Sequence, residues 1–411
     1  MKPTLRWCVA AVVFACTAAF ALADDWPQWR GPNRDGVAPG VTLPDRLPAE
    51  FKPLWEIKVG EGHAAPVVSG GKMVIFTRED HDEILRCFDL QNVKEVWRVE
   101  TPVVYQPQAV SKAHGRGPFA TPAIADGKVF ALGITGLLTC CDLATGKVLW
   151  KKDFVGEFKK AYPTWGAAVS PLVEGGLCIL SVGTRTEGGL AAFDVGTGKR
   201  AWLMNQDGAA YGSPVAADIA GRRQVVTLLD SNAVGVDLPT GKLLWKAPFR
   251  VEYEQNVVTP VVHGDLVVVS GWGQGTVGLR VAAGDNVTAS QAWKNEPEGM
   301  YLSSPVRNGD YLYGLASRQE GTLVCLSLKD GTTAWSSPGK QGEYVSIVRA
   351  GDRLLILSIK GELVLVAADP TAYKELGRTR VTERPVWCHL VVAGGRLFVK
   401  DETRLICLEL R

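Results

Sequence analysis

The chain has 411 residues, of which 46% are hydrophobic and 21% charged, the balance of an ordinary globular protein. Lysine and arginine total 45 against 43 aspartates and glutamates, so the chain has no basic field to hold a phosphate backbone. These numbers exclude an intrinsically disordered chain and argue against sequence-independent nucleic-acid binding. The 45 glycines follow no G-X-Y period, which indicates many tight turns and therefore many short strands.

Residues 1–23 have the pattern of a secretory signal peptide. Two basic residues precede an apolar run over 7–20, and the A-x-A cleavage signal at 21–23 follows. The run is shorter than the about 20 apolar residues of a membrane-spanning helix. A lipoprotein cleavage before Cys16 is the alternative, although the three residues before it match the usual lipobox poorly. We therefore expect an exported protein, periplasmic or extracellular, with no transmembrane segment.

Residues 24–50 form the next expected unit, an N-terminal arm. Its opening, DWPQWRGPNRDG, places two tryptophans and two arginines among turn-forming residues. We expect this arm to pack its aromatic side chains across one end of the domain that follows. A recognition arm that contacts a partner is the alternative.

Two phrases alternate along residues 51–411. The first has the form D-x-x-T-G-K-x-x-W, as in CCDLATGKVLW at 140–150 and AFDVGTGKRAW at 192–202. The second has the form S/T-P-V followed by a glycine turn and an apolar run, as in TPAIADGKVFAL at 121–132. Eight copies of each are recognisable, with some degenerate. The tryptophans that mark the first phrase lie 42 to 53 residues apart: Trp55, Trp97, Trp150, Trp202, Trp245, Trp293 and Trp335.

Each phrase predicts a β-hairpin. Glycine supplies the left-handed position of the turn, and the aspartate carboxylate can accept hydrogen bonds from turn N–H groups. Two hairpins make one unit of four antiparallel strands, which cannot bury both of its faces alone. Radial stacking of eight such units predicts an all-β, eight-bladed β-propeller over 51–411. The strand at 51–59 lacks partners of its own, and the strand at 404–410 lacks its tryptophan partner. We expect these two strands to share the last blade and so close the ring.

The repeated D-x-x-T-G-K-x-x-W phrase with S-P-V between its copies resembles the PQQ-like repeat of eight-bladed propellers. The resemblance covers about 51–411, and the opening arm looks like the start of secreted bacterial members. That group includes quinoprotein alcohol dehydrogenases and also non-enzymatic propellers such as the lipoprotein of the outer-membrane β-barrel assembly machinery. The resemblance therefore implies the fold, and leaves open whether the chain is an enzyme.

The pair Cys140-Cys141 is the first candidate for chemistry, because the resembling dehydrogenases carry a vicinal disulfide against their quinone. Here the pair lies inside the strand that leads to the D-x-x-T-G turn, and Cys87, Cys325 and Cys407 occupy the same repeat slot as Cys140. A slot that accepts cysteine or alanine is a small packing position. We expect these thiols to be reduced and buried.

Other cofactor signals are weak. No C-x-x-C-H haem motif occurs, and the five histidines form no metal-ligand spacing, so we expect no metal site. A calcium ion beside a quinone would need Glu254 and Asn256 together with a third ligand that the sequence does not show.

The expected functional site lies at one mouth of the propeller. The connection that leads into each innermost strand opens on one face, so the residues three positions before each S-P-V proline, or its equivalent, should ring the axis. These residues are His63, Phe119, Ala168, Tyr211, Val257, Leu302, Tyr344 and Trp387. The full set of expected ligand-binding residues is His63, His114, Arg116, Phe119, Trp165, Tyr211, Tyr253, Glu254, Asn256, Tyr301, Tyr344, Arg384 and Trp387. Aromatic side chains with arginine are the usual anchors of a protein interface, although packing that plugs the axis is the alternative.

Two functions follow from these features. The first is an exported, monomeric binding or scaffold propeller without a cofactor, which holds a protein, peptide or glycan partner at one face. The second is a PQQ-dependent alcohol or sugar oxidoreductase with calcium. Reconstitution with PQQ and calcium, followed by absorbance and dye-linked oxidation, discriminates between them.

Overall fold

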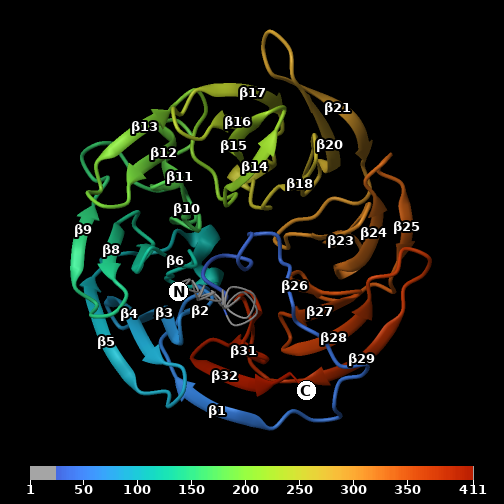
Figure 1. Cartoon of the computed structure of the whole chain (residues 1–411), viewed down its shortest axis with the longest axis horizontal. Helices are drawn as coiled ribbons and strands as arrows, with labels where there is room; N and C mark the ends of the chain where they lie inside the picture. The colour runs from blue at the N-terminus through green and yellow to red at the C-terminus, as the bar shows by residue number, and fades with distance from the viewer. Residues whose placement is uncertain (1–24, 411) are drawn as a thin grey trace, which may run out of the picture.

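The computed structural model describes residues 25–410, so the leader expected over 1–23 lies outside the described residues. Within that range, 32 strands form eight four-stranded antiparallel sheets arranged in a ring around a central axis (Figure 1). The predicted eight-bladed β-propeller is confirmed. None of the helices in the described part of the chain is long and apolar enough to cross a membrane.

The first four blades follow the chain from the innermost to the outermost strand. Blade 1 contains β2 (Val67–Ser69), β3 (Lys72–Glu79), β4 (Asp82–Asp89) and β5 (Glu95–Pro102). Blade 2 contains β6 (Ala123–Ala125), β7 (Lys128–Leu132), β8 (Leu138–Asp142) and β9 (Val148–Lys152). Blade 3 contains β10 (Leu172–Glu174), β11 (Leu177–Gly183), β12 (Gly188–Asp194) and β13 (Arg200–Met204). Blade 4 contains β14 (Val215–Ile219), β15 (Arg222–Leu228), β16 (Asn232–Asp237) and β17 (Leu243–Pro248).

The next three blades repeat this order. Blade 5 contains β18 (Val261–His263), β19 (Leu266–Gly271), β20 (Gly275–Ala282) and β21 (Thr288–Asn295). Blade 6 contains β22 (Val306–Asn308), β23 (Tyr311–Ala316), β24 (Thr322–Ser327) and β25 (Thr333–Ser336). Blade 7 contains β26 (Val345–Ala350), β27 (Arg353–Ser358), β28 (Glu362–Ala367) and β29 (Glu375–Arg380). Three short 3-10 helices, η1 (Ala109–His114), η2 (Glu252–Glu254) and η3 (Arg318–Glu320), lie in the connections.

Blade 8 closes the ring with both ends of the propeller. Its inner strands β30 (Val391–Ala393), β31 (Arg396–Lys400) and β32 (Arg404–Glu409) come from the end of the chain, and its outer strand β1 (Pro53–Lys58) comes from the start. Strand β1 pairs antiparallel with β32, with Trp55 opposite Cys407. The expected closure is therefore confirmed, and no seam between the first and last blades is left open.

The D-x-x-T-G-K turn forms as the sequence predicts. In blade 2 the carboxylate oxygen of Asp142 accepts hydrogen bonds from the backbone N–H groups of Ala144 and Thr145 and from the Thr145 hydroxyl. Gly146 follows at a φ of 72°, which only glycine adopts without strain. These contacts turn the chain from the third strand of a blade into the fourth.

The tryptophan of the phrase joins each blade to the next. The indole of Trp97 lies against Gly146 of the following blade, so closely that a Cβ atom there would lie 2.7 Å from the ring. Its Nε1 donates a 2.9 Å hydrogen bond to the carbonyl of Leu143 in the same turn. The same inter-blade bond is made by Trp150, Trp202, Trp293 and Trp335. The repeat tryptophans are buried, except that Trp55 and Trp150 are half-buried.

The cysteine slot lies directly opposite this tryptophan. The residues that face a repeat tryptophan across the outer strand pair are Cys87, Cys140, Ala192, Gly235, Gly278, Cys325 and Cys407. A small side chain is required there because the indole fills the space. Cys140 and Cys141 point to opposite faces of β8 and belong to separate inter-blade cores. All seven described cysteines are buried free thiols.

The S/T-P phrase links the innermost strands around the axis. The Thr121 hydroxyl accepts a 3.1 Å hydrogen bond from the backbone N–H of Ala65 in the preceding blade. Thr121 N–H in turn donates to the Ser170 hydroxyl, and Ser170 N–H to the Ser213 hydroxyl. At these positions the hydroxyl before the proline satisfies a buried N–H group of the preceding blade.

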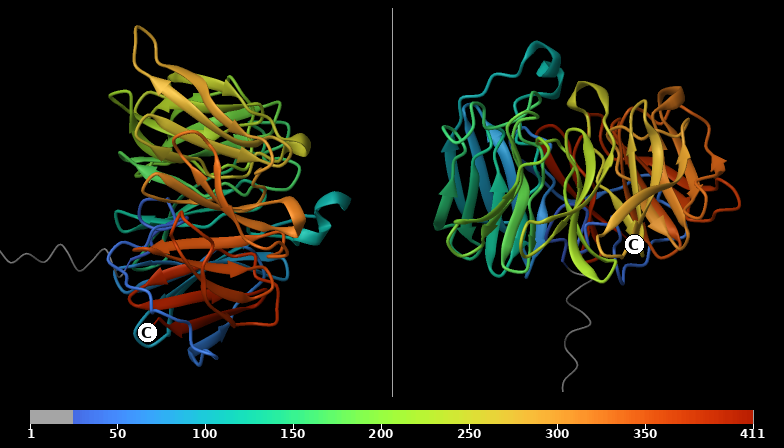
Figure 2. Two further views of the ribbon diagram at one scale, coloured as in Figure 1. Left: turned by 90° about the vertical axis from the view of Figure 1, so that its right-hand side faces the viewer. Right: turned by 90° about the horizontal axis from the view of Figure 1, so that it is seen from above.

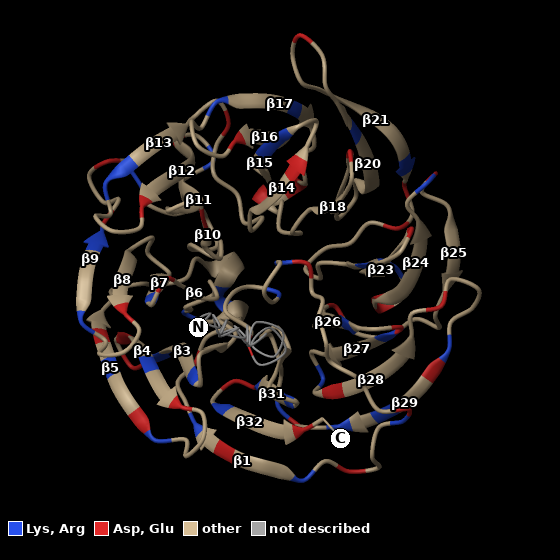
Figure 3. Ribbon diagram, viewed as in Figure 1, with Lys and Arg blue, Asp and Glu red and all other residues tan. Residues whose placement is uncertain are grey.

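The two faces of the ring differ. The connections into the innermost strands rise on one face, the mouth face, where the loop carrying η1 projects furthest (Figure 2). The arm lies on the opposite face and enters the axis from there (Figure 2). Charges of both signs are interspersed around the ring (Figure 3).

The arm is held by the inner strands. Trp26 is buried and forms an antiparallel bridge with Val68 of β2. Further along, the buried Arg34 guanidinium donates to the carbonyl oxygens of Ser170, Pro171 and Pro214. Arg30 is also buried and donates to the carbonyl of Pro305. The arm thus binds the S/T-P segments of several blades and covers this end of the axis.

Candidate functional site

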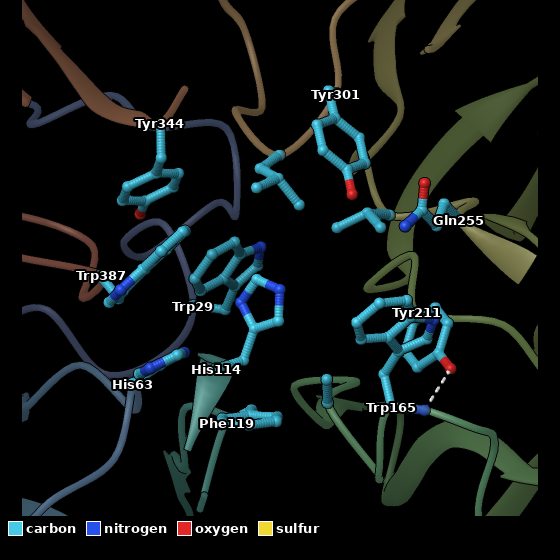
Figure 4. A pocket seen from close by; sticks show the side chains of 13 residues that line it. Trp29, His63, His114, Phe119, Trp165, Tyr211, Gln255, Tyr301, Tyr344 and Trp387 are labelled. Carbon is cyan, nitrogen blue, oxygen red and sulfur yellow. Dashed lines mark hydrogen bonds between the residues drawn. The ribbon is translucent and has the colours of Figure 1, made fainter. Parts of the chain in front are cut away.

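A cavity of about 180 Å³ opens at the mouth of the axis. All eight residues that the repeat register places around the mouth line it. The expected residues His114, Trp165 and Tyr301 line it too, and Trp29 and Gln255 join them without having been predicted (Figure 4). Each blade contributes a residue to the cavity lining because the connection into its innermost strand ends at the axis.

One wall of the cavity is a continuous arc of stacked rings. His63 stacks on Phe119 with ring centroids 4.7 Å apart and on Trp387 with centroids 5.4 Å apart. Trp387 stacks in turn on Tyr344 at 5.7 Å. These four rings come from four successive entries into the inner strands, so the stacking also joins blades 7, 8, 1 and 2 at the mouth.

The facing wall depends on Tyr211. Its hydroxyl oxygen accepts a 2.9 Å hydrogen bond from the backbone N–H of Trp165, and its side chain is buried. The indole Nε1 of Trp165 donates a 3.3 Å hydrogen bond to the carbonyl of Tyr253. The loop 153–168 and the segment around η2 are therefore held together next to the cavity (Figure 4).

His114, the last residue of η1, lies across the mouth between the two walls. Its imidazole makes edge contacts with Trp165 at 5.5 Å and with Trp387 at 5.4 Å. The long loop 103–118 thus places one ring at the centre of the opening (Figure 4).

Trp29 forms the floor of the cavity. It comes from the arm on the opposite face, and its indole Nε1 donates a 2.9 Å hydrogen bond to the Thr259 hydroxyl. The buried His389 packs edge-on against it, with centroids 5.2 Å apart. The sequence DWPQWRG showed that the arm contains this tryptophan, but no local pattern indicates that its side chain reaches the cavity at the mouth.

Five of the expected residues do not line the cavity. Asn256 is fully buried, and its amide donates to backbone carbonyls and accepts from Val251 N–H, so it holds the loop. Tyr253 is exposed, and Glu254 lies beside Tyr211 at the rim. Arg116 lies 3.7 Å from Glu61, and Arg384 donates to the Thr403 hydroxyl. Asn256 therefore has a structural role in this loop, and its part in ligand binding stays a prediction.

Arg116 lines a second, more polar cavity next to the first. It has a volume of about 310 Å³ and shares His63, His114 and Trp387 with the mouth cavity. The carboxylates of Glu61 and Glu402 also line it. The two cavities together extend from the axis towards the edge shared by blades 8 and 1.

The histidines of the mouth are held uncharged. Burial, together with the positive charge of Lys400, lowers the pKa of His63 to about 3. Burial also lowers the pKa of His114, although Glu343 acts in the opposite direction. Both rings therefore present neutral, flat surfaces at neutral pH.

The residues present do not fit the quinone arrangement that the resemblance implied. Cys140 and Cys141 lie inside β8 on opposite faces and do not line the cavity, so they offer no vicinal pair to a cofactor there. Among the described residues, no group of three or more histidine, cysteine or acidic side chains could hold a metal ion. Asn256, one of the two calcium ligands considered, uses its amide on backbone groups.

Comparison with known proteins relates the chain to two groups. A family model described as outer membrane protein assembly factor BamB matches residues 81–337. The outer membrane protein assembly factor BamB of Shewanella oneidensis is 25% identical over 250 residues, which are 58% of this chain. The chain spans about 60% of the length of that curated relative.

Solved structures show the same ring. BamB from Moraxella catarrhalis superposes with a TM-score of 0.64 at 15% identity, covering 88% of this chain and 98% of that chain. Quinohemoprotein alcohol dehydrogenase from Comamonas testosteroni superposes with a TM-score of 0.65 at 14% identity, covering 96% of this chain and 81% of that chain. At these identities the likeness establishes the fold alone.

Proposed function

Because the chain belongs to the family of the outer membrane protein assembly factor BamB, we propose that it is an exported binding propeller. It holds a protein or peptide partner on the mouth face and uses no quinone. The leader pattern and the family membership support a location in the cell envelope.

The distribution of exposed apolar side chains carries this proposal. Five of the large hydrophobic residues that the structure leaves exposed lie on connections of the mouth face: Val104, Val110, Val155, Tyr253 and Trp272. Val104 is 95% exposed and Tyr253 is 69% exposed. The others lie on the outer strands β1, β5 and β9. Exposed apolar side chains gathered around an aromatic cavity are typical of a protein interaction site.

The mouth cavity offers a partner an apolar opening at the axis. Its own volume is about 180 Å³, and it adjoins the more polar cavity of about 310 Å³. The rim carries polar groups around an apolar centre, as interfaces do. A chain that binds through this face would insert a side chain at the axis and cover the exposed residues around it.

Site-specific photocrosslinking in the native host tests the proposal. A photoreactive phenylalanine analogue replaces Val110, Tyr253 or Trp272 on the mouth face, and Lys147 or Lys199 in turns on the opposite face. All five positions tolerate the analogue because they are exposed.

We expect the mouth positions to give one common, protease-sensitive adduct and the two lysine positions to give none. Equal adducts from both faces would contradict a mouth-face site. A protease-resistant adduct that stains for carbohydrate would assign the face to a glycan instead of a protein.

A further inference from the structure

We propose that the mouth cavity binds a cationic side chain of the partner, an arginine or a lysine, between its aromatic rings and the carboxylates of Glu343 and Glu254. This inference rests on the proposed function, because it names the chemistry by which the mouth face recognises its partner. Three features of the cavity carry it: the rings, the balance of charges at the rim and the size of the opening.

The rings provide the first feature. Trp29 forms the floor, and Trp165, Tyr211, Tyr301 and Tyr344 stand around it (Figure 4). Tryptophan and tyrosine faces attract a cation within about 6 Å of the ring centroid, more strongly when water is excluded. The histidines that share the cavity are neutral at neutral pH, so they do not repel a positive charge.

The charges at the rim provide the second feature. Glu343 directly precedes Tyr344, which lines the cavity, and its exposed carboxylate acts electrostatically on His114 and Tyr301. Among the described ion pairs, none engages Glu343. Glu254 acts on Tyr211 in the same way from the neighbouring blade. Two carboxylates therefore flank the tyrosine side of the cavity.

The arginines around the mouth are engaged elsewhere. Arg116 lies 3.7 Å from Glu61, and Arg384 donates to the hydroxyl of Thr403. Arg185 lies 3.8 Å from Asp230 and 4.0 Å from Glu254, so it offsets part of the Glu254 charge. Among the described ion pairs, these leave Glu343 unengaged next to Tyr344, and Glu402, which lines the second cavity beside His63 and Trp387, is also unengaged.

Two buried cations, Lys400 and Arg30, bias which side of the cavity a cation occupies, because Arg30 acts on Tyr344 and on the His389 ring that packs against Trp29. The buried Nζ of Lys400 donates to the carbonyl of Gly62 behind His63, so positive charge lies at the wall formed by His63 and Trp387. A guanidinium or ammonium group would be repelled from that wall and attracted towards Tyr301 and Glu343. The expected position is therefore on the Tyr301 side of the cavity.

The size of the opening provides the third feature. A cavity of about 180 Å³ accepts one long side chain and excludes a folded segment of the partner. Long basic side chains combine an apolar stem with a charged end. Such a side chain would lay its stem along the stacked rings and bring its charge to the carboxylates.

Calorimetric titration with small probes tests the inference. N-acetyl-arginine amide supplies the cation, N-acetyl-citrulline amide is its uncharged match, and N-acetyl-glutamate amide carries the opposite charge. Cellotriose tests whether the rings bind a sugar instead. We expect the arginine probe to bind, the citrulline probe to bind about two- to fivefold more weakly and the glutamate probe not to bind.

Two variants locate the charge. Glu343→Gln should weaken binding of the arginine probe about two- to fivefold and leave the citrulline probe unchanged. Glu252→Gln is the matched control, because Glu252 is exposed on η2 and does not line the cavity. Both side chains are exposed, so neither variant should alter folding.

Equal binding of the arginine and citrulline probes, or tighter binding of the glutamate probe or cellotriose, would overturn the inference. The crosslinking experiment separates this failure from failure of the proposed function. Protein adducts at Val110 with no arginine binding would leave the interface standing and reject only the cation. Arginine binding without protein adducts would reject the protein interface and support only the cation-binding cavity.

Discussion

The indole Nε1 of Trp202 on β13 donates a 3.0 Å hydrogen bond to the carbonyl oxygen of Leu238, which belongs to the next blade. The same indole covers Gly241, where an added Cβ atom would lie 2.5 Å from the ring. One side chain therefore joins two sheets through both a buried hydrogen bond and apolar packing. The repeat of this contact around the ring explains why tryptophan and glycine are spaced as they are in the sequence.

Truncation of this tryptophan should be costly. We expect Trp202→Ala to lower the free energy of unfolding by about 3–5 kcal/mol, because it leaves a cavity and an unpaired buried carbonyl. Trp272→Ala is the control, since that indole is 45% exposed on the mouth face and its loss should cost within about 0.5 kcal/mol. Urea unfolding measures both variants. Similar losses for the two would contradict the inter-blade role.

The buried thiols should be inert in the folded protein. Burial raises the pKa of Cys140 and Cys141 to about 12, so the reactive thiolate is scarce at neutral pH. We expect no alkylation by iodoacetamide in the native state, and alkylation of all seven described cysteines after unfolding without a reductant. Mass spectrometry measures the added mass. A pair that resists alkylation until a reductant is added would show a disulfide and refute the expectation.

The arm should contribute to the stability of the ring. Arg34→Ala would leave the carbonyls of Ser170, Pro171 and Pro214 without their donor, so we expect a loss of at least about 3 kcal/mol. Arg46→Ala changes an exposed arginine of the same arm and should have almost no effect. Thermal unfolding followed by circular dichroism compares the two. An unchanged melting temperature for Arg34→Ala would mean that the arm is not part of the folded unit.

Stability should depend on pH through His389. Burial lowers the pKa of this histidine to about 3, whereas an unfolded histidine titrates near 6.5. Because the folded pKa is lowered, the unfolded state takes up a proton first as the pH falls. The stability that neutral His389 contributes is therefore present above about pH 6.5 and is lost as the pH falls towards 3. Between pH 6 and 4 the free energy of unfolding falls as the pH decreases. We expect this slope to be smaller in His389→Gln than in wild type, by about 1.4 kcal/mol per pH unit.

Glu83 changes the free energy of unfolding with pH in the opposite direction to His389, over an overlapping pH range. Burial raises its pKa to about 7, so its contribution is present below about pH 4.5 and is lost as the pH rises through 7. For this reason the wild-type protein alone is not diagnostic, and the difference between wild type and His389→Gln is the quantity to measure. His81→Gln, which changes an exposed histidine, is the matched control. A slope for His389→Gln equal to that of the control would contradict the prediction.

The buried tyrosines of the mouth are unsuitable for testing partner binding by truncation to alanine. Tyr211 and Tyr344 are each 6% exposed, and the Tyr211 hydroxyl holds the Trp165 backbone, so alanine at either position would alter folding together with binding. Exposed residues at the rim separate the two effects. The register predicts the position of these tyrosines, but only the packing shows that they also support the wall.

Local patterns in the sequence determined the ring of blades. The D-x-x-T-G-K turn, the tryptophan and the S/T-P pair make the same short-range or next-blade contact in most copies, so one repeat is enough to interpret most of the others. Trp245 is an exception, because it donates to Gln224 of its own blade. The same regularity predicted the eight residues around the mouth, because a residue three positions before the proline of the S/T-P phrase has one possible place in a propeller. When the same local motif recurs at a regular interval, the position of each copy in the ring follows from the repeat alone.

Only the tertiary structure decided what those residues surround. Trp29 reaches the floor of the cavity by a hydrogen bond to Thr259, 230 residues away, and nothing near Trp29 in the sequence encodes that contact. Asn256 turned inward to satisfy backbone groups, and the loop 103–118 brought His114 over the opening. Residues outside the repeats have no register to fix them, so their positions follow from packing across the axis, where chain segments distant in sequence compete for the same space.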